Sequence, residues 1–199
     1  MDITALGPLG LQMLAGLGLA AAAGLRAFLP PFLLGLLARL GWIPLRPEFD
    51  LLASTPVLVI LGTAVLAEVL GDKVPLVDHA LDLLGTLLKP AAGAFVLAAT
   101  VTHLGAIPAA LLGIVAGGGT AFTVHVAKSG LRLASTGTTS GLGNPLLSIG
   151  EDLLALAATL AAIFVPLLLI AVLFLGLVLL RRIVRWMQER LRTTAPSRA

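Results

Sequence analysis

The sequence contains no cysteine and no tyrosine, and it has only two tryptophans. Without cysteine, the chain has no disulfide, no thiolate nucleophile and no metal site built on sulfur. Charge is also scarce, since charged residues make up 12% of the 199 residues, whereas an ordinary soluble domain carries roughly a quarter. Hydrophobic residues make up 58%. A soluble globule of this size cannot hide so much apolar surface, so the composition indicates a protein that lies in a lipid bilayer.

Sequence motifs of common enzymes are missing too. The chain has no His-Glu-x-x-His, no Gly-x-Ser-x-Gly and no phosphate-binding loop. We therefore expect neither an enzyme nor a bound cofactor or metal, and a lipid-modifying enzyme is the least favoured of our hypotheses. The formal charge of +3 does not indicate a nucleic-acid partner. Much of the basic excess lies in the C-terminal tail beside an apolar stretch, where it is typical of a membrane topology signal.

Apolar stretches predict an all-α, polytopic membrane helical bundle with about six membrane segments. The segments expected are residues 5–25, 28–42, 51–71, 91–104, 108–131 and 153–180. Several are short for a crossing, which takes about 20 residues. The last is expected to be one helix kinked at Pro166, and two short crossings that meet at Pro166 are the alternative. Gly117, Gly118 and Gly119 predict either very close helix packing or a local break. Residues 74–88 carry apolar side chains at helical spacing, which predicts a separate amphipathic helix at the membrane interface.

We expect a single transmembrane domain over residues 1–180, followed by a basic cytosolic tail over residues 181–199. The arginines of the tail place the C-terminus in the cytosol by the positive-inside rule. The location expected is the bacterial cytoplasmic membrane, with the lipid bilayer as the main partner. Small-residue faces favour a homodimer, because they let helices approach closely in lipid.

An acidic group marks the end of the third apolar stretch. Residues 68–82 hold four of the ten acidic residues, namely Glu68, Asp72, Asp78 and Asp82. Glu68 precedes the polar boundary by a full turn, and a carboxylate at such depth usually faces a protein interior, water or a partner. The alternative is that Glu68 lies at headgroup level and only solvates a helix end. Asp72 and Lys73 form either an internal ion pair or a plain loop, and paired aspartates such as Asp78 and Asp82 are more often solvated than metal-bound.

A cationic group lies further along the chain. His125, Lys128 and Arg132 are spaced three and four residues apart, so they share one helix face. This face would hold a phosphate or a carboxylate, or would pair with the acidic group; an ordinary interfacial face is an equal alternative. Arg26, between two apolar stretches, either snorkels or binds an anion. His79 and His103 are expected at the interface.

The two groups belong to a short internal similarity. Residues 62–68 resemble residues 119–125 at an offset of 57 positions. If the chain is duplicated, Glu68 and His125 are equivalent, as at the repeat interfaces of transporters; a chance match is the alternative. The residues expected to shape the site are helix starters and first-turn residues, namely Pro75, Pro90, Asn144, Ser148, Glu151 and Asp152.

Five separated motifs resemble those of a known family. They are Gly24-Leu-Arg26-Ala-Phe-Leu-Pro30, Glu68-x-x-x-Asp72-Lys73-x-Pro75-x-x-Asp78, Lys89-Pro90-x-x-Gly93-Ala94, Lys128-x-x-x-Arg132, and Asn144-Pro145-x-x-Ser148 followed by Glu151-Asp152. In this order, over about residues 14–166, they resemble an uncharacterised bacterial membrane family, domain of unknown function 4126. The resemblance implies an integral membrane protein and no particular activity.

The function we expect is transport by a small carrier or channel, with or without proton coupling, for an ion, an anionic small molecule or a lipid headgroup. Glu68 would be the titrating residue. The cationic group and Arg26 would face an anion, while Asp72, Lys73 and Asp78 would gate or pair. The alternative is a membrane scaffold or assembly protein whose polar residues only fix its shape.

Overall fold

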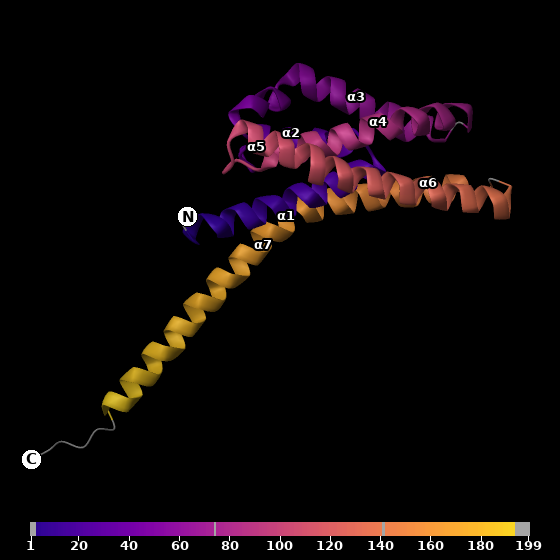
Figure 1. Ribbon diagram of the computed structural model, residues 1–199. Helices are drawn as coiled ribbons and strands as arrows, with labels where there is room; N and C mark the ends of the chain where they lie inside the picture. Colours follow the sequence, from indigo (N-terminus) through magenta and orange to yellow (C-terminus); the bar gives the residue numbers. More distant parts are fainter. Residues whose placement is uncertain (1–2, 74, 141, 194–199) are drawn as a thin grey trace, which may run out of the picture. The chain divides into compact units, whose positions relative to one another are not determined.

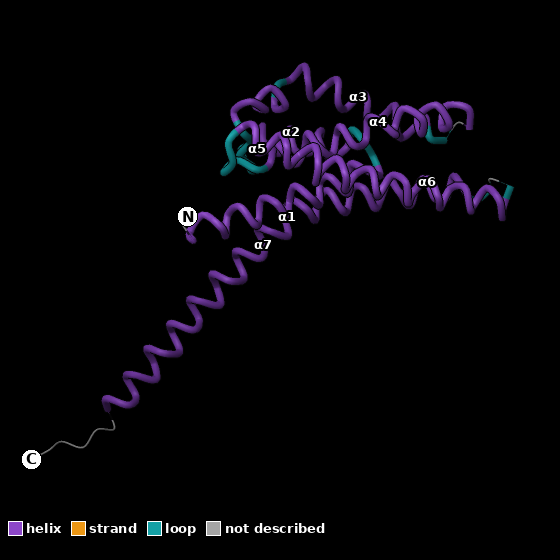
Figure 2. The backbone as a smooth tube through the Cα atoms, in the orientation of Figure 1, coloured by secondary structure: helices purple, strands orange, loops and turns teal. Residues whose placement is uncertain are grey.

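The structure is a computed structural model that describes residues 3–73, 75–140 and 142–193. Every regular element in these ranges is helical, as predicted (Figures 1 and 2). The elements are α1 (Ile3–Leu25), α2 (Leu29–Arg39), the 3-10 helix η1 (Pro47–Ala53), α3 (Thr55–Gly71), α4 (Pro75–Thr100), α5 (Ala106–Leu112), the π-helical η2 (Gly113–Gly118), α6 (Gly119–Thr139) and α7 (Asn144–Thr193).

Fewer helices are long enough to cross a membrane than the six predicted. Among the described residues, three helical stretches are long and apolar enough: Leu81–Thr100, Ala106–Thr139 and Asn144–Val165. A fourth span is obtained if η1 and α3, which meet at a bend of 65°, are taken together. The second expected segment falls short because α2 has only 11 residues, about half of what a crossing takes.

Helix α4 corrects the prediction for the middle of the chain. The expected interfacial helix over residues 74–88 and the expected segment over residues 91–104 are not separate helices, because one continuous helix runs from Pro75 to Thr100. Pro90 lies inside it, so the prediction that Pro90 opens a helix is wrong, whereas Pro75 is the first residue of α4. A proline inside a helix removes one backbone hydrogen bond and is usually disfavoured. Here the neighbouring Lys89 is buried and anchors this turn of α4 to α6 through His125.

The glycine run of the fifth segment combines close packing with a local irregularity. The chain is helical from α5 to α6, but Gly113–Gly118 forms a stretch of π-helix. A Cβ atom added to Gly93 of α4 would lie 2.6 Å from the carbonyl oxygen of Gly117. The two backbones therefore approach so closely that only glycine fits at this crossing.

Helix α6 extends into the polar, glycine-rich stretch that connects it to α7. α6 continues to Thr139, where threonine hydroxyls donate to backbone carbonyls one turn earlier. Ser140 then adopts a left-handed conformation with φ 52°. α7 begins at Asn144, as the Asn-Pro pair predicts, and this start lies before the apolar segment expected from residue 153.

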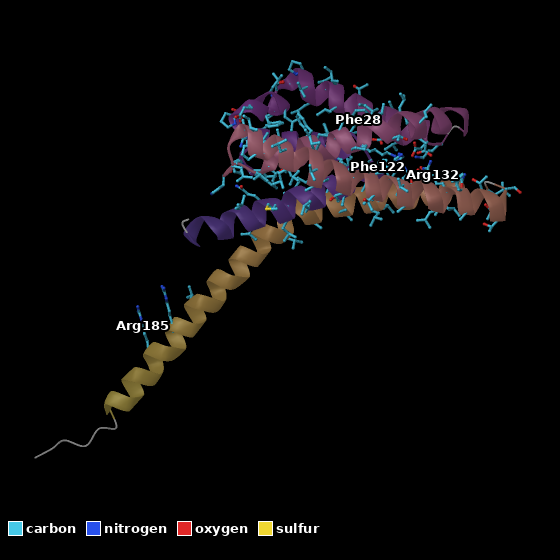
Figure 3. The ribbon with its side chains drawn as sticks, in the orientation of Figure 1. Phe28, Phe122, Arg132 and Arg185 are labelled. Atoms are coloured by element: carbon cyan, nitrogen blue, oxygen red, sulfur yellow. The ribbon has the colours of Figure 1, made fainter. Side chains whose placement is uncertain are left out.

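The contacts divide the chain into two units, Met1–Ile163 and Phe164–Ala199. The first unit holds the core, in which α1 packs against α4, η2 and α6. Its buried side chains are small or branched, including Leu19, Ala20, Leu34, Val96 and Ala99. Apolar side chains on the outside of α3, such as Val59, Ile60, Leu66 and Leu70, are exposed, as a lipid-facing surface requires. The second unit continues α7 and exposes Arg181, Arg182 and Arg185 (Figure 3).

Candidate functional site

Arg26 lies in the connection between α1 and α2, and its side chain is only 1% exposed. Its guanidinium contacts the carboxylate of Asp72, reaches Asp152 of α7 at 2.6 Å and donates to the Ser148 hydroxyl at 3.2 Å. A buried charge is tolerated only when it is paired and hydrogen-bonded. Arg26 therefore does not snorkel, and it ties the end of α1 to α3 and α7.

Asp72 follows α3 and gathers three cations around one carboxylate oxygen. Oδ2 contacts the Arg26 guanidinium and lies 3.0 Å from Nη2 of Arg132 and 3.7 Å from Nζ of Lys128. Burial opposes ionisation of Asp72, but the charges of the three cations outweigh it and lower the pKa of this carboxyl. Asp72 is therefore an ionised internal partner of the cationic group.

The predicted helix face of α6 points inward. Lys128 and Arg132 are both buried, and both contact Glu151 on α7. Arg132 is labelled in Figure 3. Arg132 binds Glu151 through two hydrogen bonds of 3.1 and 2.7 Å, and Lys128 lies 3.0 Å from the same carboxylate. Lys128 also donates to the carbonyl of Leu25 at the end of α1, at 3.3 Å. Cations are favoured at such helix C-termini.

Glu68 is buried in the last turn of α3 and binds backbone rather than a cation. Its two carboxylate oxygens accept hydrogen bonds from the amides of Ala27 at 2.9 Å and Phe28 at 3.3 Å. These amides immediately precede α2, whose N-cap residue makes no side-chain cap of its own. A carboxylate at a helix N-terminus satisfies donors that the helix leaves open and complements its dipole. Glu68 therefore fixes the start of α2, and among the acidic residues expected to pair with the cationic group it is Asp72, and not Glu68, that contacts Lys128 and Arg132.

A second buried contact joins α4 to α6. Nζ of Lys89 lies 3.2 Å from Nδ1 of His125, and Oγ1 of Thr86 lies 3.4 Å from Nε2 of the same ring. An ammonium group only donates, so Nδ1 must accept and the imidazole carries its proton on Nε2, facing Thr86. Asp82 lies two turns before Lys89 on α4, with its carboxylate 4.0 Å from Nζ of Lys89 and 3.9 Å from Nη1 of Arg132. In this arrangement, Lys89 and His125 share one positive charge.

Gly85 provides the space for this pair. A Cβ atom at residue 85 would lie 3.3 Å from Nζ of Lys89 and 3.5 Å from Cε1 of His125. Sequence reasoning missed Lys89, Thr86 and the role of Gly85, because Pro90 was interpreted as the start of a new helix. The sequence does contain a signal for Lys89. It is a lone lysine in an apolar run, and it follows Asp82 by seven residues, which places both on the same face of a helix two turns apart.

Two cavities adjoin these side chains. The smaller, about 20 Å³, is lined by charged groups of both signs and by apolar residues: Ala27, Phe28, Glu68, Asp72, Leu81, Asp82, Gly85, Leu88 and Lys89. It has room for about one water molecule. The larger, about 200 Å³, is mainly apolar and is lined by Arg26, Leu29, Val65, Glu68, Val69, Asp152 and Leu156.

A comparison with protein families identifies the chain. Residues 13–186 match the family described as Domain of unknown function (DUF4126). The chain belongs to this family. The matched range includes every residue of the buried site from Arg26 to Asp152. No curated protein and no solved structure matches this DUF4126 chain.

The remaining predicted residues of this DUF4126 member lie around the site or outside it. Lys73 is 42% exposed and lies 3.6 Å from Asp152, at the edge. Asn144 starts α7 and donates to Thr136, while Ser148, Glu151 and Asp152, expected as first-turn residues, contact the cations directly. The side chains of Pro75, Asp78 and His79 lie outside the described residues, and His103 is exposed. The described part of the chain holds no cluster of three metal-ligating side chains.

We use the name buried ion-pair network for the charged side chains that meet here. It joins four basic groups, Arg26, Lys89, Lys128 and Arg132, with four acidic groups, Asp72, Asp82, Glu151 and Asp152, and the partly exposed Lys73 lies at its edge. Lys128 and Arg132 each contact two different carboxylates. Because several cations have alternative partners within reach, the DUF4126 network can exchange ion pairs without leaving a buried charge alone.

Proposed function

We propose that this protein is a small integral membrane transporter, a proton-coupled carrier or channel for an ion, an anionic small molecule or a lipid headgroup. The observation that carries the proposal is the buried contact between Lys89 and His125. Each residue belongs to a helix long and apolar enough to cross a membrane. Ionisable residues inside such helices are costly and are typical of ion and proton pathways.

The Lys89–His125 pair is suited to carry the coupled proton. If the imidazole gains a proton, Nδ1 can no longer accept from Lys89, and two cations face each other across 3.2 Å. The pair must then separate or pass a proton on. The charged groups that face it are Asp82 from α4, Lys128 from α6 and Glu68 from α3. Proton loading thus pushes α4 and α6 apart and redistributes the ion pairs.

We assign the coupled proton to this pair and not to Glu68, the residue that the sequence analysis predicts to titrate. Both oxygens of Glu68 already accept backbone hydrogen bonds, a role that an ionised carboxylate fills. The smaller cavity, with room for one water molecule between Glu68, Asp82 and Lys89, supports a proton route toward the pair. We further propose that the protein is a homodimer in the bacterial cytoplasmic membrane, with its C-terminus in the cytosol. Duplication of the two halves of the chain stays a prediction.

A scaffold or assembly role is the second candidate, and the contacts of Glu68 and Arg26 favour it. Glu68 fixes the start of α2, and Arg26 joins the end of α1 to α3 and α7. Polar groups used in this way stabilise one arrangement of helices. A scaffold would need no change of partners in the network.

Flux measurements on proteoliposomes separate the two functions. Vesicles with a trapped pH-sensitive dye are given a membrane potential and gradients of chloride, acetate or phosphate in turn. We expect proton flux above that of empty vesicles, and its loss in His125→Gln. His103→Gln is the matched control, because His103 is exposed. Absence of flux under every gradient with the wild type would favour the scaffold.

A further inference from the structure

Three cations of the buried ion-pair network converge on a single oxygen atom. Arg26, Lys128 and Arg132 all contact Oδ2 of Asp72, and all three are buried. Two of them come from one face of α6 and the third from the end of α1. Several donors aimed at one oxygen are the arrangement that proteins use to bind a carboxylate or a phosphate.

We propose that Arg26, Lys128 and Arg132 form an anion subsite that the Asp72 carboxylate fills in this structure, and that its exchangeable ligand is a short-chain monocarboxylate. This inference names the substrate class of the transport proposed above and rests on that proposal.

The position of Asp72 allows the exchange. Asp72 lies in the turn that follows α3, outside the helix itself. The three cations are fixed by other partners: Arg26 by Asp152, and Lys128 and Arg132 by Glu151. Displacement of Asp72 therefore leaves the cations in place and requires only a local movement of the turn.

The charge of the ligand follows from the same contacts. With Asp72 displaced, the four cations of the network face the three carboxylates of Asp82, Glu151 and Asp152, so the network carries one excess positive charge. A monoanion restores neutrality, whereas a phosphate with close to two charges would leave an uncompensated buried negative charge, which is costly. A carboxylate also reproduces the geometry of the group that it replaces.

The size of the ligand follows from the adjoining cavity. The mainly apolar cavity of about 200 Å³ is lined by Arg26 with the carboxylates Glu68 and Asp152 at its polar end, and by the apolar side chains Leu29, Val65, Val69 and Leu156. Nε of Arg26 is buried, and it has no hydrogen-bond partner in the part of the chain that the structure describes. This donor and the apolar lining suit an acid with a short hydrocarbon tail, since the volume is below the roughly 300–1,000 Å³ typical of drug-sized ligands.

Rescue of an Asp72 variant by small acids tests the subsite without any transport. In detergent, the melting temperature of Asp72→Ala is measured with acetate, propionate, chloride or phosphate at equal ionic strength. We expect acetate and propionate to raise Tm by at least about 2 °C over chloride, and the wild type to respond less because Asp72 competes. Asp50→Ala, which removes an exposed carboxylate, should show no selective rescue.

Asp72→Asn serves as a second variant if Asp72→Ala does not fold, because the amide keeps the shape of the side chain. Loss of the acetate effect on adding Arg132→Gln would support the subsite. Equal effects of acetate and chloride in both variants would overturn it. Acetate rescue without flux in vesicles would support the subsite and refute the transport proposal. Flux without acetate rescue would support transport and refute the subsite.

Discussion

Lys89 of α4 and His125 of α6 meet at 3.2 Å inside the bundle, with the ammonium donating to Nδ1 of the ring. The contact joins two helices that are each long and apolar enough to cross a membrane. It holds one positive charge on two basic groups, so any further proton must change the contact. The mechanism that we propose follows from this constraint.

The space beside the pair gives a first prediction. In Gly85→Ala, the new methyl group meets the end of the Lys89 side chain at 3.2 to 3.3 Å, so the ammonium must shift by a few tenths of an ångström. We expect proton flux in proteoliposomes to fall several-fold, with little change in the melting temperature, since a flexible side chain absorbs the shift. Gly130→Ala is the matched control, because nothing lies within 4 Å of a Cβ atom there. Equal flux in both variants would count against the pair as the proton carrier.

The cap that Glu68 forms on α2 gives a second prediction. Glu68→Ala removes both acceptors for the amides of Ala27 and Phe28 and should cost about 1–3 kcal/mol of stability. Glu68→Gln keeps one acceptor, so we expect a smaller loss of stability and nearly normal flux. Thermal unfolding in detergent and the flux assay measure the two effects. If Glu68→Gln folds but abolishes flux, Glu68 and not the Lys89–His125 pair carries the proton.

The lowered pKa of Asp72 gives a third prediction, for acidic pH. Because its pKa is lower in the folded than in the unfolded protein, Asp72 contributes stability that is fully present above the unfolded value of about 3.9 and is lost as pH falls below it. The melting temperature of the wild type should therefore drop on acidification through this range. Asp72→Asn should start lower and show a shallower drop. Parallel curves for the two proteins would contradict the ion pairing of Asp72.

The glycine crossing of α4 and η2 gives a fourth prediction. Gly93→Ala places a methyl group 2.6 Å from a backbone oxygen of Gly117, and neither backbone can move without separating the helices. We expect a loss of about 1–3 kcal/mol, the usual cost of overpacking, seen as a lower melting temperature. Gly119→Ala is the control, with nothing within 4 Å of the added atom, and it should be neutral or slightly stabilising in a helix. Similar melting temperatures for both variants would show that the crossing is not close-packed.

Much of the architecture could be predicted from the sequence, because apolar stretches and costly charges are local signals. The helical class, the start of α7 at Asn144 and the irregular glycine run follow from composition and turn chemistry. The number of spans did not, because length alone does not tell whether short apolar helices such as α2 cross. The single helix α4 was missed because a proline usually starts or ends a helix, and the contacts that keep Pro90 inside one come from another helix.

The sequence predicts most of the charged residues of the site, but it leaves open which of them form ion pairs with each other. Arg26, Lys128 and Arg132 were identified because a charge in an apolar chain needs a partner. Which carboxylate each cation binds depends on tertiary packing, as in the contact of Arg26 with Asp152. The cap that Glu68 provides uses backbone amides about 40 residues earlier in the chain, and no residue type marks such a donor. Sequence reasoning therefore found the charges and included Asp72 among the possible partners of the cationic group, but it did not find the backbone partners of Glu68.

The most direct test of the central claim is the distance between α4 and α6 as a function of pH. Because the chain has no cysteine, Leu87→Cys and Leu133→Cys, at exposed positions of the two helices, can each carry a spin label without background. The account predicts that the distance distribution in proteoliposomes shifts between about pH 8 and pH 5, where histidine gains a proton. The shift should persist in His103→Gln and disappear in His125→Gln. A distribution that is the same at both pH values, with the wild-type pair intact, would contradict it.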